Sequence, residues 1–130
     1  LWRLPRPLLL ASGSQTRRAL LESAAIPHEA EAPAVDERAI EAEARAAGAD
    51  PAGVAKALAA AKALDVSRRH PGRLVLGADQ TLDCDGRGFH KPAGRDEARR
   101  QIAALSGRTH VLHSALALAQ AGGLVAGLRD

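Results

Sequence analysis

Short continuous apolar runs alternate with longer segments of helical periodicity, and this alternation constrains the fold of the chain more than any other feature. Residues 7–11 form an apolar run that ends in Ser12-Gly13-Ser14, the pattern of an inner, parallel strand leading into a loop. Further strands are predicted at 28–33, 73–78 and 109–119, and residues 124–128 return after a turn. Helices are predicted at 14–25, 37–48, 50–69 and 96–105. Alternating strands and helices predict one α/β domain.

Helical spacing also predicts which side chains turn inward. Ser14 and Asp50 are placed to cap the first and third helices, and Pro51 suits a first helical turn. Val54 and Leu58 hold helical spacing along the third helix. We expect inward-facing apolar residues on the two outer helices as well, namely Ala19, Leu20 and Ala24 on the first, and Ile102 and Leu105 on the last.

The composition favours a packed core and argues against several functional classes. Hydrophobic residues make up 46% of the 130 residues, with one Trp, one Phe and no Tyr or Met, so small aliphatic side chains must fill the core. Single-strand nucleic-acid binders need stacking aromatic residues, which are scarce here. The 18 basic residues are interleaved with 15 acidic ones, so no basic stripe forms. A lone cysteine, Cys84, fits a reducing compartment, and no apolar run is long enough to span a membrane.

The loop 12–18 is the first candidate binding site. It lies where a buried strand leads into a helix, and it contains hydroxyl groups and two arginines. Free backbone N–H groups at a helix start, together with these side chains, suit a phosphate group. An ordinary helix cap followed by two solvated arginines is the alternative reading, and the spacing of a Walker loop is absent.

Asp79 is the second candidate, because it follows the apolar run 74–78 and its charge needs a partner or a metal there. A turn-forming aspartate is the alternative. Lys62 on an Ala/Leu-rich helix and Lys91 after the Asp85-Gly86 turn could each neutralise a phosphate, although surface lysines are commoner. Glu37 follows Asp36 at a helix start, where acids also complement the helix dipole.

In order and spacing, these elements together resemble the Maf family of nucleotide pyrophosphatases, also known as septum-formation inhibitors. The resemblance rests on the segment 10–21, Val35-Asp36-Glu37, Leu58-Ala59 with Lys62-Ala63, Leu76-Gly77-Ala78-Asp79-Gln80, Asp85-Gly86, Lys91-Pro92 and Leu105-Ser106-Gly107-Arg108 with His110. It covers nearly the whole chain. It implies a Maf-type, ITPase-like mixed sheet flanked by helices, with a cleft between two lobes. Because Maf proteins are longer, residues 1–130 are expected to be a single domain lacking its C-terminal part.

The resemblance also assigns roles residue by residue. Asp79 matches the catalytic base, and Glu37 and Asp79 match positions that handle a divalent metal, Mg²⁺ or Mn²⁺. Thr16 and Gln80 occupy positions linked to nucleobase choice, and Gln80 resembles the branch that acts on 7-methyl-GTP. Gln15 and His90 depart from the usual Pro and Gly of the family. The remaining substrate-binding positions are Ser12, Ser14, Arg17, Arg18, Lys62 and Lys91.

The predicted function is hydrolysis of a nucleoside triphosphate, such as 7-methyl-GTP, to the monophosphate and pyrophosphate in the cytoplasm. No nucleic-acid or membrane partner is expected, and a homodimer is left open. The alternative is a non-catalytic protein that binds nucleic acid or regulates septum formation and cell division.

Overall fold

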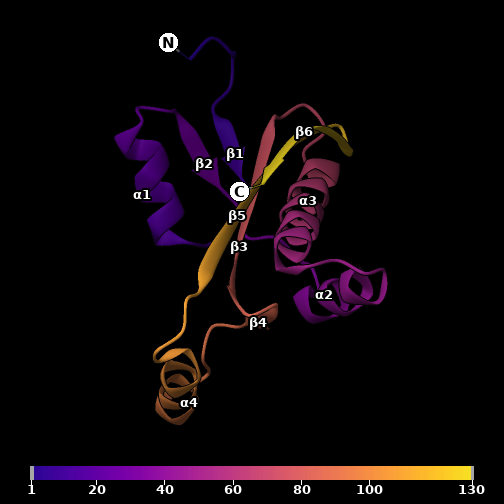
Figure 1. Ribbon diagram of the computed structural model, residues 1–130. Helices are drawn as coiled ribbons and strands as arrows, with labels where there is room; N and C mark the ends of the chain where they lie inside the picture. Colours follow the sequence, from indigo (N-terminus) through magenta and orange to yellow (C-terminus); the bar gives the residue numbers. More distant parts are fainter. Residues whose placement is uncertain (1, 130) are drawn as a thin grey trace.

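The computed structural model of the protein describes residues 2–129 and contains one mixed β-sheet (Figure 1). The strand order is β2-β1-β3-β5-β6, with β4 paired to β3 outside this path. Strands β1, β2 and β3 are parallel, whereas β4, β5 and β6 join in antiparallel pairs. The strands are β1 (Leu8–Leu10), β2 (His28–Ala30), β3 (Val75–Cys84), β4 (Arg87–Phe89), β5 (Val111–Gln120) and β6 (Gly123–Arg129). The predicted α/β class is confirmed.

Four helices connect these strands, and three of them begin at side-chain caps. The helices are α1 (Gln15–Ser23), α2 (Glu37–Ala46), α3 (Pro51–Arg69) and α4 (Arg95–Leu105). Ser14, Asp36 and Asp50 each accept a hydrogen bond from a backbone N–H in the first turn of α1, α2 and α3. The caps predicted at Ser14 and Asp50 are therefore confirmed. Figure 1 shows α1 and α3 on opposite sides of the sheet, with α4 beyond its lower end.

The core lies between α3 and the strands β3 and β5. It consists mainly of alanine and valine, including Ala59, Ala63 and Val66 of α3 and alternate residues of β5. A Cβ atom at Gly77 of β3 would overlap the Ala59 carbonyl oxygen and lie 2.8 Å from the Ala63 nitrogen. Only glycine therefore allows α3 to approach the sheet this closely.

One edge of β3 is open in its middle. Strand β5 pairs with β3 from Val75 to Asp83 along one edge. On the other edge, β1 pairs only with Val75 and Leu76, and β4 pairs only from Leu82 to Cys84. Residues 77–81 of β3 therefore border a gap in the sheet, and Asp79 lies at its centre. We expected Asp79 at the end of a strand, but the strand continues through it because β5 supports it on the other edge.

The inward faces predicted for two helices are wrong. Leu20 of α1 is 65% exposed and Ile102 of α4 is 68% exposed, and neither helix contains a buried residue among those described. Val54 and Leu58 of α3 are buried, as expected. Within residues 2–129, no helix combines the length and apolarity needed to cross a bilayer.

Candidate active site

A cleft of about 1240 Å³ opens at the gap in the sheet. Its walls come from the start of α1, the exposed side of α2, the first half of α3, the middle of β3 and the β4 segment. Charged side chains of both signs line it. The predicted site residues among them are Ser14, Thr16, Arg17, Glu37, Lys62, Asp79, Gln80 and Lys91.

Lys62 lies between two carboxylates at the wall of this cleft. Its Nζ donates to Asp79 Oδ1 at 2.8 Å and is 2.6 Å from Glu37 Oε1. Lys62 is 8% exposed and Asp79 9% exposed, whereas the Glu37 side chain is largely open to the cleft. A buried lysine needs such partners, because an isolated ammonium group away from water is strongly disfavoured.

The close packing of α3 on β3 explains how Lys62 meets Asp79. Lys62 precedes Ala63, which contacts Gly77, and Asp79 lies two residues beyond Gly77 on the same face of β3. The two charged groups therefore meet where the helix approaches the strand most closely. Their sequence separation of 17 gave no indication of this contact.

The pKa of Asp79 is raised above its ordinary value. Burial is the largest cause, since removing the carboxylate from water disfavours its charged form. The hydrogen bond and charge of Lys62 and the charge of Arg17 act in the opposite direction, while the charge of Glu37 adds to the rise. A carboxyl group with a raised pKa is a stronger base once it is ionised.

The start of α1 carries two arginines, and one of them lies at the cleft. Ser12 is buried, and its hydroxyl oxygen accepts hydrogen bonds from the Ser14 N–H at 3.1 Å and from Arg17 Nη1 at 3.3 Å. The Ser12 hydroxyl therefore helps to fix the position of the Arg17 side chain. Arg18 lies elsewhere, beside a separate hollow formed with the end of α1 and the start of β2. The structure brings Arg17 to the other site residues but does not bring Arg18 there.

The two residues expected to read the base also lie at the cleft. Gln80 is exposed, and its Nε2 donates to Ser114 Oγ at 3.1 Å. Thr16 lines the same cleft from the start of α1, and Lys91 lines it from the segment after β4. These three residues come from β3, from α1 and from the segment after β4, and they line the same cleft as Lys62.

Part of the cleft wall that α2 forms was not predicted from the sequence. Glu41 and Arg45 line the cleft and form an ion pair of 2.7 Å. Glu41 Oε2 is also 3.3 Å from Nε2 of His90, which lines the cleft as well. Glu37, Glu41 and Arg45 recur at intervals of four residues, a spacing that places them on one helical face and could have identified this wall.

The carboxylates at the cleft could supply part of the coordination of a magnesium-type ion. Glu37 and Asp79 converge on one point, where Lys62 supplies the positive charge. Within residues 2–129, no group of three or more His, Cys, Asp and Glu side chains could hold a metal by itself. Mg²⁺ commonly binds through one or two carboxylates and completes its coordination with water and substrate phosphates. Two carboxylates at a cleft that also contains Arg17 and Lys91 fit that pattern.

Comparison with known proteins connects this geometry to a family. Residues 7–127 match the family described as Maf-like protein. The nucleoside triphosphate pyrophosphatase of Nitrobacter winogradskyi is 50% identical over 126 residues, which cover 96% of this chain and 61% of that protein. The 7-methyl-GTP pyrophosphatase of Mesorhizobium japonicum is 52% identical over 115 residues, which cover 88% of this chain and 58% of that protein.

A solved structure shares the fold at low sequence identity. The structure of a HAM1 protein from Coxiella burnetii matches with a TM-score of 0.60 and 16% identity, covering 95% of this chain and 68% of that chain. This likeness concerns the fold alone. The chain spans only 58% to 61% of the length of the two relatives named above. With the family match extending over residues 7–127, the chain belongs to the Maf family.

Proposed function

We propose that the protein containing this chain is a nucleoside-triphosphate pyrophosphatase that releases pyrophosphate and a nucleoside monophosphate. One observation carries the proposal most directly. Lys62 is held between Glu37 and Asp79 at the wall of a cleft that also contains Arg17 and Lys91. Basic groups able to neutralise phosphates thus surround a buried carboxylate able to act as a base. The two relatives named above, both pyrophosphatases, support the same reaction class.

Hydrolysis would proceed by attack of one water molecule on the α-phosphorus. The bond between that phosphorus and the α,β-bridging oxygen breaks, and the water oxygen joins the monophosphate. Asp79 would orient the water and accept its proton, for which its raised pKa suits it. Arg17, Lys62 and Lys91 would neutralise the charge that develops on the pyrophosphate.

A divalent metal is part of the proposal. Glu37 and Asp79 would hold Mg²⁺ or Mn²⁺, which supplies positive charge beside the phosphate oxygens when bound. The Glu37 side chain is 56% exposed and is therefore accessible to such an ion. Residues 1–130 would then form part of a single Maf domain acting in the cytoplasm, where the free thiol of Cys84 stays reduced.

We propose a purine, such as 7-methyl-GTP, as the preferred base. Gln80 can both donate to and accept from a base edge, and it lies at the cleft, where its side chain donates to Ser114. The 7-methyl-GTP pyrophosphatase named above supports this choice.

The test is a panel of nucleotides incubated with the full-length protein and Mg²⁺. We expect pyrophosphate and the monophosphate as products, with 7-methyl-GTP among the best substrates. Release of orthophosphate alone would place the cleaved bond elsewhere and contradict the proposal. Salt-dependent binding to DNA without hydrolysis of any nucleotide would favour the nucleic-acid-binding alternative.

A further inference from the structure

The segment 31–36 connects β2 to α2 and carries Glu37 to the site. It has no regular secondary structure, and it ends at Asp36, the cap of α2. None of residues 37–46, all within the described part of the chain, is buried. The apolar face of α2 is at most half-buried, as at Ile40, so polar contacts also contribute to the position of Glu37.

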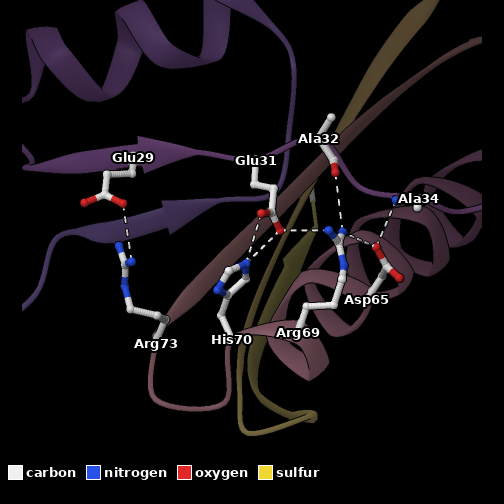
Figure 2. Close-up of polar contacts among 8 residues, drawn as sticks. All are labelled: Glu29, Glu31, Ala32, Ala34, Asp65, Arg69, His70 and Arg73. Carbon is white, nitrogen blue, oxygen red and sulfur yellow. Dashed lines mark hydrogen bonds and ion pairs between the residues drawn. The ribbon is translucent and has the colours of Figure 1, made fainter.

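The C-terminal half of α3 binds this segment at three points (Figure 2). Asp65 Oδ2 accepts the Ala34 N–H at 2.9 Å. Arg69 Nη2 donates to Asp65 Oδ2 at 2.7 Å and to the Ala32 carbonyl oxygen at 3.4 Å. Arg69 Nη1 lies 2.9 Å from Glu31 Oε2. Two residues of one helix thus hold the backbone and a side chain of the segment.

The same stripe of α3 carries the site and these anchors. Asp65 follows Lys62 by three residues and Arg69 follows Asp65 by four, so all three lie on one helical face. Helix α3 is itself fixed by burial of Ala59, Ala63 and Val66 against the sheet. It therefore provides a rigid base both for Lys62 and for the segment that delivers Glu37.

We propose that Asp65 and Arg69 are positioning residues that hold segment 31–36 against α3 and thereby place the Glu37 carboxylate beside Lys62. The functional consequence rests on the proposed function, because it assumes that Glu37 binds the metal. The position of segment 31–36 and of Glu37 does not depend on the proposed function. Exposed ion pairs contribute little to global stability, so the main effect of breaking these contacts is local.

Hydrogen exchange measures the position of the segment without substrate or metal. In the full-length protein, Asp65→Ala and Arg69→Ala should lower protection of the hydrogen-bonded α2 amides of Ala39 and Ile40 at least about threefold, in addition to Ala34 itself. Asp65→Asn keeps an oxygen acceptor for the Ala34 N–H and should retain most of the protection. The global melting temperature should change little in all three variants.

Two matched controls remove charge without touching the segment. Arg68→Ala deletes the neighbouring guanidinium, for which the described structure gives no hydrogen bond or ion pair to residues 31–36. Glu29→Gln breaks the ion pair with Arg73 that joins β2 to the turn before β3 (Figure 2). Both should leave exchange of the Ala39 and Ile40 amides at the wild-type level.

Metal binding tests the consequence at the site. With Mn²⁺ alone as the probe, Asp65→Ala and Glu37→Gln should each weaken binding by about tenfold, the scale seen when the support of a ligand is removed. The double variant Asp65→Ala/Glu37→Gln should bind Mn²⁺ no more weakly than Glu37→Gln alone, because both changes remove the contribution of the Glu37 carboxylate to metal binding. With excess Mg²⁺, the kcat of Asp65→Ala should return close to that of the wild type.

Two results would overturn the proposal. Faster exchange confined to Ala34, with the Ala39 and Ile40 amides unchanged in both alanine variants, would show that the anchors do not position α2. Additive losses of Mn²⁺ affinity in the double variant would show that Asp65 acts independently of Glu37. If the wild-type protein releases no pyrophosphate, the proposed function fails, and the exchange measurements alone then decide the positioning role.

Discussion

Asp79 combines two properties that ordinarily conflict at the level of a single residue. It is 9% exposed, which disfavours its charge, yet it accepts a hydrogen bond from Lys62, which favours that charge. Burial prevails, and the pKa is raised. Because the folded pKa lies above the unfolded value, this carboxyl stabilises the fold below its unfolded pKa, and that contribution is lost as the pH rises through the folded pKa.

Asp79→Asn should therefore separate activity from stability. We expect turnover to fall by at least about 10², since asparagine cannot accept the proton of water. The melting temperature at neutral pH should be unchanged or higher, because the buried negative charge is gone and Glu37 still pairs with Lys62. Calorimetry and pyrophosphate release on the same preparation measure both effects, and near-normal turnover would exclude Asp79 as the base.

The raised pKa also predicts the acid limb of the pH profile. Activity should be lost as the pH falls through a pKa higher than that of an ordinary aspartate, about 3.9, because protonated Asp79 cannot act as a base. Measuring kcat/KM between about pH 4 and pH 8 tests this. A limb at or below the ordinary value would mean that Lys62 outweighs burial.

Gln80→Thr should shift substrate preference from purine towards pyrimidine nucleotides. A threonine hydroxyl is shorter and cannot present the donor and acceptor pair of an amide. Ser114→Ala is the matched control, because it removes the partner of Gln80 but keeps the amide, and it should preserve the purine preference. An unchanged ranking of kcat/KM across the nucleotide panel in Gln80→Thr would show that Gln80 does not read the base.

At the level of elements, the contact between α3 and β3 determines the site. Gly77 allows the helix to approach, and this approach brings Lys62 to Asp79. Gly77→Ala should force the two apart, destabilising the protein by about 1–3 kcal/mol or more, the usual scale for overpacking. Pyrophosphate release should fall even at temperatures well below the melting temperature of the variant, where the protein is still folded.

Gly88→Ala is the control for that change. The added methyl group at Gly88 would meet the far end of the Arg45 side chain, 2.6 Å away, which can move aside. Its melting temperature should stay near that of the wild type. Equal destabilisation by both substitutions would mean that the close approach at Gly77 has no special role.

The sequence indicated most elements but not how they meet. The apolar run that forms β1 and the helix α3, with its cap Asp50, were predictable because their patterns are local. Leu20 was misplaced because periodicity identifies an apolar face but not its neighbour, and this residue lines the cleft instead. Glu37 and Lys62 were noted as candidates from the sequence, and the resemblance assigned their roles. Their contact depends on segment 31–36, whose tertiary anchors leave no periodic signal.

At the scale of the whole molecule, one face of the sheet remains apolar and exposed. Leu112, Leu116 and Leu128 lie on the face away from α3 and are 56%, 42% and 64% exposed. A polypeptide of residues 1–130 expressed alone should therefore self-associate and melt without a sharp transition, and it should release little pyrophosphate. Light scattering and calorimetry measure this. A soluble, cooperatively melting and active monomer would contradict the prediction.

Strands β3 and β5 each contain ten residues and run side by side from the core past the cleft towards β4 and α4. Paired strands of this length bend and twist elastically, but they do not swing like a loop hinge between rigid bodies. The walls that they connect should keep nearly the same spacing before and after a nucleotide enters. Selection among nucleotides would then depend on how well each fits a cavity formed in advance, and little binding energy would be diverted into closing it.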